Sequence, residues 1–334
     1  TYAGNLENLA DVMSHERLSF VHGDIRDVDL VRKVVAEVDV IVNAAAESHV
    51  EKSIEEGASE FVTTNVEGTQ ILLDAIRRTP VERFILISSS EVYGTAEHAP
   101  MDEEHPLNPR SPYAATKAGG DRLAYSYFVT YGLPVVIVRP FNNYGPRQHP
   151  EKVVPRFITQ ALCDEPLTIH GDGHASRDWL YVDDDAEAIE AIIEADIGAI
   201  AGEVINVATG VDISVAEIAD VVLDAVPHVR KRPIRRGTNA TEYRLPKMLR
   251  WFRRPNPARR IHVPSEKSIE ARGTKMLDER AVMLIRCHGN DHVLRTQPLQ
   301  NVAHLRANLV EVGVRERPAV HEPPETQCFD LQAH

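Results

Sequence analysis

Short apolar runs rich in β-branched residues alternate with segments of helical length through the first two thirds of this chain. Four runs of this kind lie at residues 18–21, 38–42, 84–87 and 135–138. Continuous apolar runs are typical of strands buried on both faces, as in parallel sheets that helices cover on each side. Apolar residues at helical spacing predict helices over 59–78 and 113–131. The alternation predicts an α/β fold built on a doubly wound parallel sheet.

Two further regions follow this sheet. Shorter elements with Pro and Gly at their joints occupy residues 153–226, and they predict a smaller lobe over the carboxyl ends of the strands. After about residue 227, prolines interrupt every candidate helix except short ones at 278–285 and 301–312, and no strong sheet pattern is predicted there. We therefore expect three regions, at 1–150, 151–226 and 227–334.

Charge and composition limit the partners and the compartment. The net charge is −13, yet residues 230–275 carry fifteen Lys and Arg against three acidic residues. This basic region lacks a motif that reads bases and lacks interleaved aromatic residues, so nucleic acid is not the expected partner. The chain has no apolar run of about eighteen residues, no secretory signal and only three widely spaced cysteines, which predicts a soluble protein of the cytoplasm.

Polar clusters follow four of the predicted strands. Since ligands bind at the carboxyl ends of parallel strands, the coincidence of four clusters favours a binding site over plain turns or tight packing. The clusters are Gly23-Asp24-Ile25, residues 43–49, residues 88–91 and residues 139–146.

Tyr113 and Lys117 stand four residues apart on the predicted helix at 113–131. This spacing places both side chains on one helix face, where an ammonium group can stabilise a phenolate. A preceding strand delivers Ser89 and Glu91 to the same edge. The four residues together predict an acid/base centre for redox chemistry on an alcohol.

With these motifs the chain resembles the extended short-chain dehydrogenase/reductase superfamily and its NAD-dependent epimerase/dehydratase family, most closely the dTDP-glucose 4,6-dehydratases. The resemblance covers roughly residues 1–225. It implies a Rossmann-like sheet, a nucleotide-diphosphate sugar as substrate, NAD as cofactor and no metal. The segments that carry it are residues 1–8, Ala45-Ala46-Glu47-Ser48-His49-Val50, Glu91-Val92-Tyr93-Gly94, Ser111-Pro112-Tyr113-Ala114-Ala115-Thr116-Lys117, Asn142-Asn143-Tyr144-Gly145-Pro146 and residues 177–182.

The resemblance implies a role for each residue of the centre. Tyr113, its pKa lowered by Lys117, would take the proton of the sugar 4-hydroxyl while hydride passes from C4 to NAD⁺. Ser89 would share a hydrogen bond with that hydroxyl. Glu91 would remove the C5 proton, after which water is lost and hydride returns to C6.

Two further sets of residues are implied to line the site. The cofactor set is Asp24, Ile25, Ala44, Ala45, Ala46, Glu47, Ser48, Thr64, Tyr113, Lys117 and Asn143. The substrate set is Ser89, Asn142, Glu151, Lys152, Thr168, His170, Arg177 and Asn206, and Arg177 is suited to bidentate contact with phosphate.

Ser90 departs from the dehydratase pattern, which has an Asp at this place to protonate the leaving 6-hydroxyl. A serine is a far weaker acid, so elimination would need a water relay. A UDP-glucuronate decarboxylase, which needs no acid at C6, and a nucleotide-sugar 4-epimerase therefore stay open as alternatives.

The first strand and its glycine-rich turn, which hold the pyrophosphate of NAD at a helix N-terminus, have no counterpart in the sequence. We therefore expect an N-terminally truncated member of the family, and a catalytically inactive binding protein is the alternative of another class. The resemblance also implies a homodimer that is formed by the helices at 59–78 and 113–131.

Overall fold

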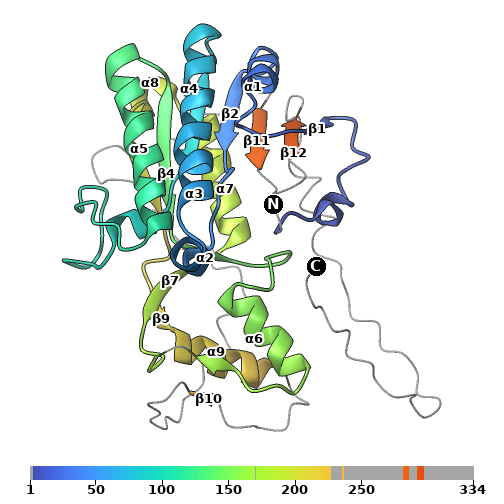
Figure 1. Cartoon of the computed structure of the whole chain (residues 1–334), viewed down its shortest axis with the longest axis vertical. Coiled ribbons are helices and arrows are strands. Elements are labelled where there is room, and N and C mark those ends of the chain that lie inside the picture. The colour runs from blue at the N-terminus through green and yellow to red at the C-terminus, as the bar shows by residue number, and fades with distance from the viewer. Residues whose placement is uncertain (1–2, 170, 227–234, 237–280, 286–291, 297–334) are drawn as a thin grey trace.

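Seven strands form the large sheet of the computed structural model, in the order β1-β12-β11-β2-β3-β4-β8 (Figure 1). The structure describes residues 3–169, 171–226, 235–236, 281–285 and 292–296. Neighbouring strands run parallel from β11 to β8, and β12 is antiparallel to both of its neighbours. The predicted α/β class with a Rossmann-like parallel sheet is confirmed. The strands are β1 (Leu18–His22), β2 (Val40–Asn43), β3 (Arg83–Ile87), β4 (Val135–Pro140), β8 (Val204–Val207), β11 (Ala281–Ile285) and β12 (His292–Thr296).

Two strands of this sheet come from the third predicted region. β11 pairs with β2, and β12 lies between β11 and β1. The prediction of a short helix at 278–285 is therefore wrong, because 281–285 forms a strand. A run of five apolar residues fits a buried strand as well as a helix, and periodicity cannot separate the two. The predicted helix at 301–312 lies outside the described residues.

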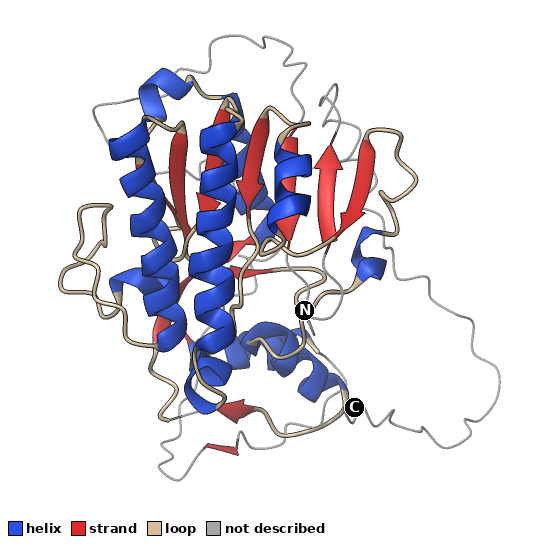
Figure 2. Cartoon of the chain, turned by 45° about the horizontal axis from the view of Figure 1, so that its top comes forward, coloured by secondary structure: helices blue, strands red, loops and turns tan. Residues whose placement is uncertain are grey.

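Helices cover both faces of the sheet (Figures 1 and 2). Side chains alternate along each strand, so Phe84 and Leu86 pack on one face while Ile85 packs on the other. The first face packs against α1 (Val28–Val35), α4 (Thr69–Arg78) and α5 (Pro112–Tyr131). The second packs against α7 (Val182–Glu194) and α8 (Ile197–Ile200).

The predicted helix at 59–78 is present with a change of winding. It comprises α3 (Ser59–Val62), a π-helical turn η2 (Thr63–Gly68) and α4. The wide turn buries the polar residues Thr64 and Asn65 at its inner side. Such π turns inside helices are frequent at functional sites.

A smaller lobe lies below the large sheet in Figure 1, at the carboxyl ends of the parallel strands. Its core packs α6 (Val153–Leu162) against α9 (Val215–Ala225) through Phe157, Ala161 and Ile218. Its strands are β5 (Asn142–Tyr144), β7 (Ser176–Tyr181) and β9 (Asp212–Ser214), with β6 (Thr168–Ile169) paired to β10 (Arg235–Arg236). Short helical elements at the edges are η1 (Leu6–Leu9), α2 (Val50–Glu55) and η3 (Ser90–Tyr93).

Candidate active site

The parallel strands β2, β3 and β4 end at the edge of the large sheet that faces the smaller lobe (Figure 1), so the polar clusters predicted after them lie at this edge. At the end of β2, Asn43 Oδ1 accepts a hydrogen bond from the Ala45 amide (3.2 Å), which turns the chain into the loop at 44–49. At the end of β3, the Ser88 amide donates to the Val138 carbonyl of β4 (2.7 Å). Because these strands are parallel, their polar ends lie next to one another.

Tyr113 lies in the first turn of α5. Ser111 caps this helix by accepting a hydrogen bond from the Ala114 amide (3.1 Å), and Pro112 has the φ angle that a first helical residue needs. The Tyr113 side chain is buried, and the Ser89 side chain lies near enough to affect its pKa. Burial raises the pKa of Tyr113 to about 12, the Ser89 side chain opposes this change, and the charge of Glu91 adds to it.

Lys117 follows one helical turn later and is also buried. Its Nζ donates to the Ile87 carbonyl at the end of β3 (2.5 Å). Burial lowers the pKa of Lys117 to about 8, and the negative charge of Asp121 opposes that lowering. In this structure burial dominates the pKa of the phenol and the Lys117 ammonium is bonded to the main chain, so the lowering of the Tyr113 pKa by Lys117 stays a prediction.

Ser90 and Glu91 begin the short helix η3. Ser89 caps it by accepting a hydrogen bond from the Glu91 amide (3.2 Å), so the three residues turn together beside Tyr113. Ser90 is buried, and the Glu91 carboxylate is partly exposed. Arg177 of β7 lies with its Nε 3.6 Å from Glu91 Oε1. Arg177, predicted to bind phosphate, therefore forms an ion pair with Glu91, predicted as the base at C5.

The loop that contains Ala44, Ala45 and Ala46 is tied to α5 by Asn65 of the π turn. Asn65 accepts from the Glu47 amide (2.9 Å) and donates to the Glu47 carbonyl (3.1 Å) and to Thr116 Oγ1 (2.9 Å). Sequence reasoning did not identify Asn65, because its partners are distant in the chain. A buried Asn beside the predicted Thr64 was the available signal.

Thr64 carries a buried hydroxyl that has no hydrogen-bond partner among the described residues. An orphaned polar group of this kind fits a site that a ligand completes. Small alanine side chains in the adjoining loop let a flat ligand approach the backbone. Thr64 and the loop at 44–46 therefore fit as part of the cofactor site that Lys117 and Tyr113 would face.

Asp24 and Ile25, predicted to contact the cofactor, follow β1. Asp24 forms an ion pair with Arg26 (Nη2 to Oδ2, 2.7 Å) and accepts from the Arg26 amide (2.7 Å). Ile25 is buried in the core beside Gly68. Both residues have structural functions here, and their contact with a cofactor stays a prediction.

Glu151 and Lys152, predicted to face the substrate, lie against the cofactor loop. Lys152 Nζ donates to the Ser48 carbonyl (3.1 Å). Glu151 Oε2 lies 3.6 Å from His49 Nε2 and 3.6 Å from His149 Nδ1. Burial lowers the pKa of Lys152, and the neighbouring Glu151 opposes that change. The structure thus brings part of the substrate set together with part of the cofactor set.

The remaining predicted residues are more dispersed. Asn142 is aligned with Trp179 in the β5–β7 pair, and Asn143 Nδ2 donates to Asp185 Oδ2 (2.6 Å). Asn206 is occupied by the protein, since its Oδ1 accepts from Tyr93 Oη (2.7 Å).

Thr168 is exposed on β6, and its amide donates to Gln160 (3.4 Å) in the smaller lobe. Its contacts give no link to Tyr113. His170 lies outside the described residues.

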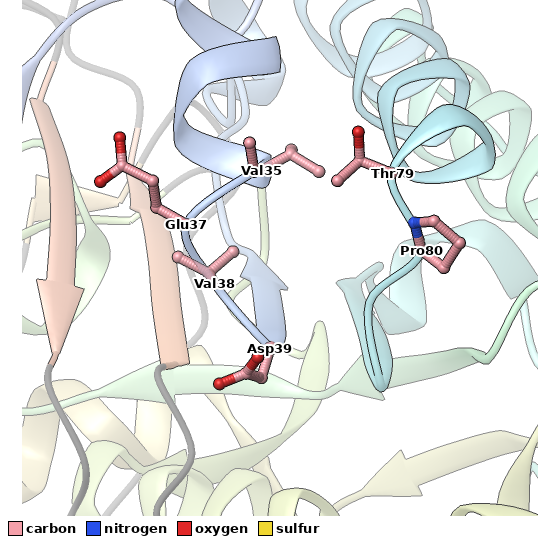
Figure 3. A pocket seen from close by; sticks show the side chains of 7 residues that line it. Val35, Glu37, Val38, Asp39, Thr79 and Pro80 are labelled. Carbon is pink, nitrogen blue, oxygen red and sulfur yellow. The ribbon is translucent and has the colours of Figure 1, made fainter.

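Among the described residues, no three His, Cys, Asp or Glu side chains gather as a metal site would require. None of the described helices is long and apolar enough to span a membrane. The pocket in Figure 3 lies between the end of α1 and the segment before β3, and is lined by residues such as Glu37, Asp39 and Pro80. It opens at the amino end of β2 and β3, which is the edge opposite to Tyr113.

The fold and the site together define a class of protein. They combine a parallel sheet with polar strand ends and a helix with a buried Tyr-x-x-x-Lys motif beside a Ser and a Glu. This combination is that of a short-chain dehydrogenase/reductase of the extended, epimerase/dehydratase class. The family model described as GDP-mannose 4,6 dehydratase matches residues 1–267. The chain belongs to this family. The resemblance predicted from the sequence is confirmed.

Individual relatives agree with this assignment. The low-salt glycan biosynthesis protein Agl12 of Haloferax volcanii is 50% identical over 227 residues, which cover 68% of this chain and 72% of the relative. A dTDP-glucose 4,6-dehydratase of Streptomyces niveus is 45% identical over 240 residues, 70% of each chain. The crystal structure of the dTDP-glucose 4,6-dehydratase DesIV of Streptomyces venezuelae, with NAD and TYD bound, superposes with a TM-score of 0.67 at 44% identity, covering 72% of this chain and 73% of the other.

Proposed function

We propose that this protein is an NAD-dependent nucleotide-sugar 4,6-dehydratase that acts on dTDP-glucose or a close analogue. The observation that carries the proposal is the buried Tyr113 phenol, which lies near Ser89 and one helical turn from Lys117. The family and the relatives named dTDP-glucose 4,6-dehydratase support the same function.

Oxidation at C4 requires a group that accepts the hydroxyl proton. In the resting site Tyr113 is protonated, because burial holds its pKa near 12. The phenol must therefore lose this proton to solvent before the phenolate accepts the proton of the C4 hydroxyl. Ser89 is placed to share a hydrogen bond with the same sugar hydroxyl. Lys117 supplies a positive charge on the same helix face, which favours the phenolate as the proton is transferred.

Thr64, Lys117 and the 44–48 loop are the residues that would hold the cofactor. NAD, when bound, supplies the acceptor for the C4 hydride and the donor that returns it to C6. The orphaned Thr64 hydroxyl supports this assignment, because a bound ligand would give it a partner.

Glu91 is the proposed base at C5, and Arg177 is the proposed phosphate contact. Since the two residues lie close to each other, a bound diphosphate would compete with Glu91 for the Arg177 guanidinium. Binding of substrate would in this way release the carboxylate toward the sugar.

Loss of the 6-hydroxyl needs a proton, and Ser90 provides only a weak acid. We propose that water relays the proton past Ser90. Replacing Ser90 by Asp should accelerate elimination, because a buried carboxyl group has a raised pKa and can serve as the acid. Slower elimination in the S90D variant would argue against this role for the position.

A two-substrate assay tests the reaction. The full chain, supplied with NAD, should convert dTDP-glucose to a 4-keto-6-deoxy sugar. Tyr113→Phe should abolish the conversion. Tyr127→Phe is the matched control on the same helix, since the Tyr127 hydroxyl donates to Asp74 (2.9 Å) and not to the site.

The second substrate decides among the alternatives. Release of CO₂ from UDP-glucuronate would establish a decarboxylase, for which Ser90 is the favouring observation, and inversion at C4 would establish an epimerase. Failure to bind NAD at saturating concentration would support the inactive binding protein instead.

We further propose a homodimer formed by the faces of α3 and α5 that the chain leaves uncovered. Val62, Tyr125, Val129 and Tyr131 are exposed large apolar side chains on these helices. Val129→Lys should then lower the mass measured by light scattering from that of a dimer to that of a monomer, and an unchanged mass would reject this interface. We also propose that the protein is cytoplasmic, which the three widely spaced cysteines support.

A further inference from the structure

Asp121 is a fully buried carboxylate that the predicted catalytic set does not include. It lies on α5 four residues after Lys117 and eight after Tyr113, so the three side chains share one helix face. Arg139 of β4 donates to both Asp121 oxygens, from Nε to Oδ2 (2.8 Å) and from Nη2 to Oδ1 (3.1 Å). Arg122 donates to Oδ1 from Nε (2.8 Å) and from Nη2 (2.6 Å).

The charge of Asp121 is firmly held. Burial alone would raise its pKa, but the hydrogen bonds and charges of Arg139 and Arg122 outweigh burial and lower it. Asp121 is therefore ionised at neutral pH. Its negative charge opposes the effect of burial on Lys117.

The same carboxylate supports the strand end that carries the serines. Ser88 Oγ donates to Asp121 Oδ2 (2.8 Å), and Ser89, the next residue, lies near the Tyr113 phenol. Movement of Asp121 would therefore shift the Ser89 hydroxyl near Tyr113.

A chain of hydrogen bonds continues from this cluster toward the smaller lobe. Arg139 Nη1 donates to Tyr93 Oη (2.8 Å), and Tyr93 Oη donates to Asn206 Oδ1 (2.7 Å) on β8. The Arg139 guanidinium also lies 4.9 Å from the centre of the Tyr93 ring. One buried network thus joins the helix of Lys117 to the ends of β3, β4 and β8.

We propose that Asp121 is a positioning residue for oxidation at C4: its carboxylate places a negative charge on the face of α5 that bears Lys117 and anchors the strand end that bears Ser88 and Ser89. This role rests on the proposed function of the site. The charged and titratable groups that face the cluster are Tyr113, Lys117 and Arg122 from α5, Arg139 from β4, and Tyr93 and Glu91 from η3.

The test follows the Lys117 amine directly in the full chain. The ¹³Cε shift of labelled lysine reports ionisation, and the Lys117 signal is assigned by its loss in Lys117→Arg. In Asp121→Asn the Lys117 pKa should fall by about one unit, because an opposite charge nearby favours the charged form by roughly one to three units. At pH 8 the ammonium population would then drop from about half to about a tenth.

The enzymatic readout must move with this titration. The alkaline limb of the rate of C4 oxidation should shift to lower pH by the same amount in Asp121→Asn. Arg122→Gln is the matched control: it removes a partly exposed partner of Asp121 and leaves the carboxylate, so the Lys117 pKa should stay or rise. A purely structural Asp121 would change the rate at every pH without moving the limb.

Several outcomes would overturn the proposal. One is a Lys117 pKa that is unchanged or raised in Asp121→Asn. Another is a Lys117 pKa that falls in this variant while the alkaline limb of the rate of C4 oxidation stays in place. The third is a fall of the Lys117 pKa in Arg122→Gln that is as large as in Asp121→Asn. If Asp121→Asn does not fold, the double variant Asp121→Asn/Arg139→Gln removes both buried charges, and its Lys117 pKa should lie about one unit below that of Arg139→Gln. If the wild-type chain has no activity, the proposed function fails, while the titration still tests the effect of Asp121 on Lys117.

Discussion

Replacing Gly120 by alanine should destabilise the protein, whereas the same change at the adjacent Gly119 should not. Both glycines lie inside α5. A Cβ atom at Gly120 would lie 2.6 Å from the main-chain oxygen of Asn65. A Cβ atom at Gly119 would meet only the Val66 side chain, at 3.2 Å.

The magnitude follows from two opposing effects. Alanine gains about 1 kcal/mol over glycine in a helix interior at either position. At Gly120 this gain is opposed by overpacking against a buried carbonyl, which costs about 1–3 kcal/mol. The two variants should therefore differ in free energy of unfolding by about 2 kcal/mol, or by about 3 °C in Tm for a chain of 334 residues.

Thermal unfolding followed by circular dichroism measures this difference. Gly120→Ala should also retain NAD more weakly than Gly119→Ala, because Asn65 ties the Glu47 backbone to α5 and would be displaced. A Gly120→Ala protein with a Tm equal to or above that of Gly119→Ala would refute the close approach of α5 to the π turn.

Three further predictions concern the site. Thr64→Val should leave stability unchanged or raise it while weakening NAD binding up to about tenfold, as measured by calorimetry, because a buried hydroxyl without a protein partner is lost; equal affinity would remove Thr64 from the cofactor site. Lys117 has a pKa of about 8 in the folded protein, so between pH 8 and 10.5 it binds fewer protons in the folded than in the unfolded state. The free energy of unfolding should therefore rise with pH across this window by up to about 3 kcal/mol. Lys117→Met should remove that rise in denaturant titrations. Arg177→Gln should raise KM for the nucleotide sugar and change stability by less than about 0.5 kcal/mol, since the side chain is half-exposed; an unchanged KM would contradict a phosphate contact.

Local patterns sufficed to predict the sheet and the catalytic helix. The runs at 84–87 and 135–138 became β3 and β4, and the helix predicted at 113–131 is α5. Strand and helix periodicity reflect burial of neighbouring residues, so they can be read within a short window. The strand at 281–285 could not be assigned in this way, because its pairing with β2 joins residues far apart in the chain.

In the candidate site, too, residues in local motifs could be predicted and residues that act through distant partners could not. Tyr113 and Lys117 were found because their spacing lies within one helix. Asn65 was missed, since it acts through partners on other elements and belongs to no local motif. Arg139 was included in the polar cluster at 139–146, but its bond to Asp121 could not be predicted, since Asp121 lies on another element. Asp121 shares the helix of Tyr113 and Lys117, but its importance arises from Arg139 on β4.

The sequence by itself determined the class of fold, the family and the residue types of the acid/base centre, because these depend on periodicity and on short motifs. Only the tertiary structure decided the protonation of that centre. Burial raises the Tyr113 pKa and lowers that of Lys117, and the Lys117 ammonium bonds the Ile87 carbonyl. The solvation of a charge depends on everything packed around it, and that environment is assembled from segments that the sequence keeps apart.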